Sequence, residues 1–110
     1  MIAVDTVIAI LFLHLLGDFL LQSDWMAINK SKSAWALWCH CMVYSLCFTV
    51  FGAAFACITF VTHSLTDAIT SRINAELWAA NKRHWFFVGI GVDQFFHYST
   101  LLLTYVLLRG

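Results

Sequence analysis

Three pairs of histidine and aspartate lie within otherwise apolar segments, and in each pair the two residues are four positions apart. The pairs are His14 with Asp18, His63 with Asp67, and Asp93 with His97. Residues four apart share one face of a helix, so each pair presents an imidazole beside a carboxylate. These groups are common protein ligands for zinc, manganese and iron. The pairs therefore predict a divalent transition-metal site, provided that their helices meet.

The order of the residues within the pairs predicts how the helices meet. Two pairs read histidine then aspartate, whereas the last pair reads aspartate then histidine. In an up-and-down bundle of four helices, the helix with the last pair runs opposite to the helices with the other two. All the aspartates then lie toward one end, with each histidine about 6 Å deeper at roughly 1.5 Å rise per residue. His40, in another apolar segment, falls near the same layer.

Further side chains fall beside this layer, and they complete two predicted groups. The predicted metal ligands are His14, Asp18, His40, His63, Asp67, Asp93 and His97. This set suits either one crowded ion or two ions that share bridging carboxylates. The residues predicted to orient a substrate are Gln22, Arg72 and Gln94, of which Arg72 suits a phosphate or carboxylate group.

Composition places these residues in a membrane protein. Hydrophobic residues make up 62% of the 110 residues and charged residues 11%, whereas soluble domains have about 25% charged residues. Six basic and six acidic residues cancel, so the chain lacks the positive field typical of nucleic-acid-binding proteins. We expect one transmembrane helical domain over residues 1–110, with the lipid bilayer as its partner and no nucleic acid.

The apolar segments predict an all-α bundle of about four antiparallel helices. Residues 2–21 and 85–108 are each long enough to span a bilayer, which takes roughly 20 residues. Polar loops are expected at residues 23–33 and 81–83. The segment 34–62 is ambiguous, because it is long for one span and slightly short for two, and Gly52 suits either a turn or a helix interior.

Charged and aromatic residues favour four helices over three. Lys30 and Lys32 lie in one polar loop, and Lys82 and Arg83 lie in the other. All five tryptophans flank these loops, as in the aromatic belt of a membrane protein. Four helices place both loops on one side of the membrane, and the positive-inside rule makes that side cytoplasmic. Both ends of the chain are then expected on the outer side.

Three functions are consistent with ionisable groups in such segments, where each charge costs roughly 2.5–3.5 kcal/mol to insert. The first is a metal site that hydrolyses a lipid-linked or membrane-proximal substrate. The second is a structural network of hydrogen bonds between helices. The third is a proton or ion path, which includes pore-forming and host-membrane-modifying phage proteins. Clustering in one half of the membrane disfavours a continuous path, although a homo-oligomer could complete one.

Several motifs in order resemble one known family. The chain carries HLLGDFLLQSDWMA from residue 14, then Lys30 and His40, then THSLTDAITSR from residue 62 and DQFFH from residue 93. This pattern is similar to the domain of unknown function 3307 family of small bacterial and phage membrane proteins. The resemblance implies a multi-pass protein of the bacterial inner membrane. It implies the following signature residues: His14, Asp18, Gln22, His40, His63, Asp67, Asp93, Gln94 and His97.

Overall fold

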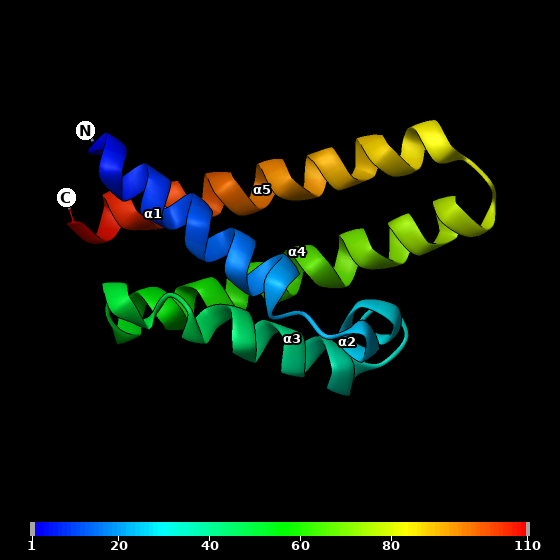
Figure 1. The fold of residues 1–110 in the computed structure, drawn as a ribbon, viewed down its shortest axis with the longest axis horizontal. Helices are drawn as coiled ribbons and strands as arrows, with labels where there is room; N and C mark the ends of the chain where they lie inside the picture. The colour runs from blue at the N-terminus through cyan, green and yellow to red at the C-terminus, as the bar shows by residue number, and fades with distance from the viewer. Residues whose placement is uncertain (1, 110) are drawn as a thin grey trace.

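The computed structural model describes residues 2–109, and every element in this range is helical (Figure 1). The elements are α1 (Val4–Leu15), the π-helical segment η1 (Leu16–Leu20), α2 (Asp24–Asn29), α3 (Ala34–Leu46), the 3-10 turn η2 (Thr49–Phe51), α4 (Ala53–Ala79) and α5 (Arg83–Arg109). The prediction of an all-α fold is confirmed over these residues.

The four longer helices, α1, α3, α4 and α5, run in alternating directions (Figure 1). Both chain ends and η2 lie at one end of the molecule, whereas α2 and the connection between α4 and α5 lie at the other. The two basic loops therefore share one end of the molecule. We call this the basic end.

The ambiguous segment forms two helices, because the chain turns after α3. Leu46 ends α3, the turn η2 follows, and Gly52 begins α4 with φ of 107°. A positive φ of this size is readily adopted only by glycine. Gly52 is therefore the residue of a tight turn and does not lie inside one long tilted helix.

The polar stretch 23–33 differs from the loop that we predict, because it contains the short helix α2. Ser23 accepts a hydrogen bond from the backbone N–H of Met26 at the start of α2, and Ser33 accepts one from Ala36 at the start of α3. Serine is a favoured N-cap because its side chain satisfies an otherwise free helical N–H. These two caps set where the helices begin, and Lys30 lies between them.

Two helices, α4 and α5, are long and apolar enough to cross a membrane. Each contains 27 residues. The helix α1 has 12 residues and continues into the 5 residues of η1, while α3 has 13. Both are shorter than the roughly 20 residues of a full span. The expectation of four spans is thus supported for two helices only.

The interior of the bundle is apolar toward the chain ends and polar toward the basic end. Ile10, Tyr44, Phe48, Phe55 and Leu101 form the buried apolar cluster. Beyond it, the buried side chains include four histidines and two aspartates. Many large apolar side chains point outward instead. This distribution reverses that of a soluble protein, in which outward faces are mostly polar.

Candidate metal centre

The predicted ligands converge from all four longer helices. His14 comes from α1 and Asp18 from η1, which continues it, while His40 comes from α3, His63 and Asp67 from α4, and Asp93 and His97 from α5. All are buried except Asp93, which is partly buried. The spacing of four along each helix and the alternating helix directions bring these side chains together, as the reversed order of the last pair predicts.

One group of four side chains comes from three different elements, η1, α3 and α4. We call Asp18, His40, His63 and Asp67 the four-ligand group. Nε2 of His40 lies 3.0 Å from Oδ1 of Asp18, 3.1 Å from Nε2 of His63 and 3.2 Å from Oδ2 of Asp67. Nε2 of His63 lies 3.6 Å from Oδ1 of Asp18 and 3.4 Å from Oδ2 of Asp67. One atom of each side chain lies within 4.8 Å of the other three.

These distances match the ligand shell of a tetrahedral ion. Ligand atoms roughly 2.0–2.1 Å from a tetrahedral zinc ion lie about 3.3 Å from one another. Hydrogen bonds alone satisfy the group less well, because the single N–H that Nε2 of His40 can carry faces three close neighbours. A cation at the centre would contact all four atoms at once.

A second group shares one carboxylate with the first. We call Asp18, Asp93 and His97 the three-ligand group, and their ligand atoms also lie within 4.8 Å of one another. Nε2 of His97 lies 3.1 Å from Oδ1 of Asp93 and 3.2 Å from Oδ1 of Asp67. Because the other oxygen of Asp67 faces His40 and His63, its carboxylate lies between the two groups. Asp18 and Asp67 are thus the carboxylates that would bridge two ions if both groups held one.

Ring stacking, together with the polar contacts at Nε2, orients the ring of His63. The ring stacks on Tyr44 at 3.7 Å between centroids and on His97 at 4.2 Å. Nδ1 of His63 and Nδ1 of His40 have no hydrogen-bond partner within the described residues. Metal-bound histidines commonly donate Nδ1–H to a second group, so in this site the aromatic stack takes over that orienting role.

His14 differs from our prediction, because it belongs to neither ligand group. Its Nε2 lies 2.6 Å from Oε1 of Gln94, and its Nδ1 lies 2.7 Å from Oη of Tyr44. Oε1 can only accept, so Nε2 of a neutral His14 donates and Nδ1 accepts from the tyrosine hydroxyl. Nε2 of Gln94 then donates to Asp18 at 3.3 Å and to Asp93 at 3.2 Å. His14 therefore positions Gln94, and its Nε2 also lies 3.6 Å from Oδ2 of Asp18.

Lys30 supplies a positive charge at the same carboxylates. Its Nζ lies 3.2 Å from Oδ2 of Asp67, and the Lys30 side chain is 18% exposed. Burial lowers the pKa of Lys30, but the nearby charges of Asp67 and Asp18 outweigh burial, so its pKa is raised. The side chain is therefore a charged ammonium that reaches from the loop after α2 into the site.

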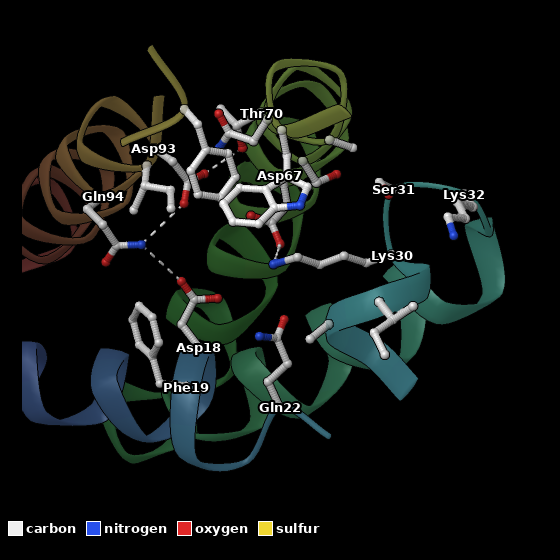
Figure 2. A pocket seen from close by; sticks show the side chains of 18 residues that line it. Asp18, Phe19, Gln22, Lys30, Ser31, Lys32, Asp67, Thr70, Asp93 and Gln94 are labelled. Carbon is white, nitrogen blue, oxygen red and sulfur yellow. Dashed lines mark hydrogen bonds and ion pairs between the residues drawn. The ribbon is translucent and has the colours of Figure 1, made fainter. Parts of the chain in front are cut away.

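A pocket of about 550 Å³ leads from the basic end to the carboxylates (Figure 2). Asp18, Asp67 and Asp93 line it, whereas the histidines of both ligand groups do not. The histidines thus lie deeper than the aspartates, as the reversed pair predicts. In Figure 2, Gln22 and Lys30 face this cavity.

Two of the three predicted substrate-orienting residues lie at the pocket. Gln22 and Gln94 line it. Arg72 does not, because it is exposed on α4 outside the lining. The structure therefore does not bring Arg72 to the site. Arg72 follows Ser71 on α4, so it lies off the helical face that carries Asp67.

The backbone around Asp18 is irregular where α1 approaches α3. The π-helical segment η1 contains Gly17 and Asp18, and such segments are frequent at functional sites. A Cβ on Gly17 would lie 2.9 Å from Cδ2 and 3.2 Å from Cα of Tyr44. The absence of a side chain at Gly17 is therefore what allows α3 to pack this closely beside the site.

Comparison with known protein families identifies the family of this chain. The model of the family described as "Protein of unknown function (DUF3307)" matches residues 6–109. The chain belongs to this family. No curated protein matches it. No solved structure matches it.

Within this member of the DUF3307 family, sequence reasoning missed three contributors to the site. Tyr44 is a buried hydrogen-bond donor, Lys30 is an inward-facing ammonium, and Thr70 donates to Oδ1 of Asp93. Thr70 could have been found, because it continues the polar stripe of His63 and Asp67 along α4. Tyr44 also had a signal, because it lies four residues after His40 and so on the same helical face. Lys30 had no such signal beyond its place among the family motifs.

Proposed function

We propose that this protein is a membrane-embedded metalloprotein whose two ligand groups hold two divalent transition-metal ions. The observation that carries the proposal is the four-ligand group, in which four atoms from three elements lie at tetrahedral ligand spacing. Zinc, manganese and iron suit this set of imidazole nitrogens and carboxylate oxygens. Bridging carboxylates between two ions are a known arrangement in helical bundles.

The charge of the site supports a bound cation. With neutral histidines, the carboxylates of Asp18, Asp67 and Asp93 outweigh the ammonium groups of Lys30 and Lys32 by one negative charge around the pocket. Buried charge without compensation is costly. One divalent ion offsets this excess and leaves the site positive, and a second ion in the three-ligand group would add to that positive charge. A positive site favours attraction of an anionic substrate from the open pocket.

The reaction that we propose is hydrolysis of a substrate at the membrane surface. A divalent ion in such a site lowers the pKa of a bound water and so supplies hydroxide near neutral pH. The chain's own contribution is positioning: Gln94 holds the carboxylates of Asp18 and Asp93, and His14 holds Gln94. Gln22 faces the cavity and is free to contact the substrate (Figure 2).

The outward faces of the helices support a membrane location. Leu65 is 63% exposed, Ile69 62% and Phe95 65%. Exposed apolar area on this scale typically marks an interaction surface or a membrane face. All five tryptophans are exposed and flank the basic end, where a membrane interface would hold them. We propose the inner membrane of a bacterium, with the basic end in the cytoplasm.

One contact favours a second function, a structural ion network without metal. Lys30 already lies 3.2 Å from Oδ2 of Asp67, and a lysine ammonium can compensate a buried carboxylate. In that case the aspartates and histidines hold the helices together, and metal is irrelevant. The two functions differ in what a neutral substitution of Asp67 removes: bound metal in the first, stability alone in the second.

Elemental mass spectrometry of the detergent-purified protein separates these functions. We would purify without chelators and offer zinc, manganese and iron separately. We expect about two equivalents in the native protein, about one in His97→Ala and none bound tightly in Asp67→Asn, since Asp67 faces both groups. His84→Ala is the matched control, because His84 is exposed at the start of α5 and contributes to neither group.

Folding of each variant is checked by circular dichroism and elution volume. A folded native protein that retains no metal would refute the metalloprotein and favour the ion network. Equal metal content in the native protein, Asp67→Asn and His84→Ala would refute the assignment of the site.

A further inference from the structure

The pocket beside the metal centre has two kinds of wall. Its lining includes the carboxylates and also the apolar side chains of Trp78, Phe86 and Ile90, which we call the apolar wall. The cavity lies at the basic end, where the exposed tryptophans gather. A ligand that fits both walls therefore carries a polar group and an apolar portion.

Unpartnered polar atoms mark the polar part of this pocket. Oε1 of Gln22, Oγ of Ser71 and Oδ1 of Asn74 are buried without a hydrogen-bond partner in the described part of the chain, and all three residues line the pocket. Of the other hydroxyls of α4, those of Thr62 and Ser64 donate to backbone carbonyls one turn earlier, whereas the Thr59 hydroxyl also has no partner but lies outside the pocket. Buried polar groups without partners are uncommon in folded proteins. We take these three as ligand-binding groups.

Hydroxyl groups are the chemistry that fits all three atoms. A hydroxyl both donates and accepts, so it can pair with the serine and with either end of an amide side chain. A quaternary ammonium, in contrast, offers no hydrogen-bond donor. The three atoms therefore favour a ligand with hydroxyl groups over one whose polar end is methylated.

The charge of the metal-loaded site favours a ligand that also carries a phosphate group, and this inference rests on the proposed function. Without metal, the carboxylates of Asp18, Asp67 and Asp93 outweigh the ammonium groups of Lys30 and Lys32 and disfavour anions. With two divalent ions the balance becomes positive, and phosphate oxygens are good ligands for such ions and for lysine. Binding of an anion is thus expected only in the metal-loaded protein.

We propose that this pocket binds the headgroup of a membrane lipid that carries both a phosphate and free hydroxyl groups. The phosphate faces the metal centre and Lys30, the hydroxyls contact Gln22, Ser71 and Asn74, and the chain of the lipid leaves along the apolar wall. A soluble phosphate ester of a polyol shares the polar chemistry but has nothing to place against Trp78 and Phe86.

Three probes test the proposal on the metal-loaded, detergent-purified protein: dioctanoyl phosphatidylglycerol, dioctanoyl phosphatidylcholine and glycerol 1-phosphate. Affinity is measured by calorimetry, and metal content is measured on the same samples. We expect phosphatidylglycerol to bind about tenfold more tightly than either other probe, the difference expected of one or two hydrogen bonds. Removal of the metal should abolish this preference.

Variants locate the binding groups. Ser71→Ala and Asn74→Ala are each expected to weaken phosphatidylglycerol binding severalfold while keeping the native metal content. Ser64→Ala is the matched control, because the Ser64 hydroxyl donates to the backbone of Phe60 and lies outside the pocket. Two separate variants keep the test valid should one of them fold poorly.

The outcomes separate this proposal from the metal centre. Metal-loaded protein that binds all probes equally, or variants that bind like Ser64→Ala, would overturn the lipid headgroup and leave the metal centre intact. Tighter binding of glycerol 1-phosphate than of the lipid would overturn the lipid and assign the pocket to a soluble ester. A folded protein without metal would overturn both proposals.

Discussion

Replacement of Gly17 by alanine tests the closest helix contact at the site. A Cβ at this position would lie 2.9 Å from Cδ2 of Tyr44, whereas ordinary contacts begin at 3.4 Å, so one group must move by about 0.5 Å. The Tyr44 ring has little freedom to move, because it is 1% exposed and stacked on His63. The backbone Cα of Tyr44 is also close, at 3.2 Å. Alanine should therefore push η1, and with it the end of α1, away from α3.

The expected loss of stability follows from overpacking. Extra methyl groups in a packed core typically destabilise by about 1–3 kcal/mol, while replacing glycine by alanine in a helix recovers about 0.5–1 kcal/mol. We expect Gly17→Ala to lower the free energy of unfolding by about 1–2 kcal/mol. Gly91→Ala is the matched control, because a Cβ there meets nothing within 4 Å. That control should be neutral or slightly stabilising.

The assay is denaturant unfolding in mixed micelles, followed by circular dichroism and tryptophan fluorescence. The two variants should differ by roughly 2 kcal/mol, or more than tenfold in the unfolding equilibrium. Equal stability of Gly17→Ala and Gly91→Ala would show that α1 and α3 do not meet at Tyr44 as described. The positions of Asp18 and His14 relative to α3 would then need revision.

Three further predictions concern the site and its orientation. Tyr44→Phe removes the donor to Nδ1 of His14, so we expect the free energy of unfolding to fall by about 1 kcal/mol in the same assay, with metal retained. Unchanged stability would contradict the hydrogen bond from Tyr44 to His14. Lys30→Met removes the ammonium beside Asp67 and should tighten metal binding by roughly tenfold in a chelator competition; weaker binding would instead make Lys30 a supporting residue. Single cysteines at Lys32 and Lys82, on a cysteine-free background, should react with an impermeant thiol reagent from the same side of the membrane, and labelling from opposite sides would disprove the four-helix topology.

Periodicity and residue order were sufficient to predict most of the ligand set. Helical spacing places each histidine and aspartate on one face, and membrane segments exclude charge unless it has a partner, so ionisable residues there stand out. The reversed pair at Asp93 and His97 then fixed the direction of α5 relative to α4. These inferences depend on local geometry and on solvation, both of which a sequence expresses directly.

Other features depend on packing between helices, which the sequence expresses only weakly. His14 has the same spacing to Asp18 as His63 has to Asp67, yet its ring nitrogens are taken by Tyr44 and Gln94. Nothing in the local pattern distinguishes the two pairs. Likewise, Lys30 reads as a loop residue, and only the path of the chain after α2 directs its ammonium to Asp67.

The stripe of His14, Asp18 and Gln22 shows how one irregular segment divides a regular pattern into three roles. On an unbroken α-helix these residues would share one face. In the structure, α1 ends at Leu15, η1 holds Asp18, and Gln22 lies beyond η1. His14 is thus buried behind Gln94, Asp18 reaches both ligand groups, and Gln22 faces the cavity. The irregular segment η1 thus lies where the candidate metal centre meets the pocket, and the stripe supplies a support for Gln94, a candidate metal ligand and an amide at the pocket.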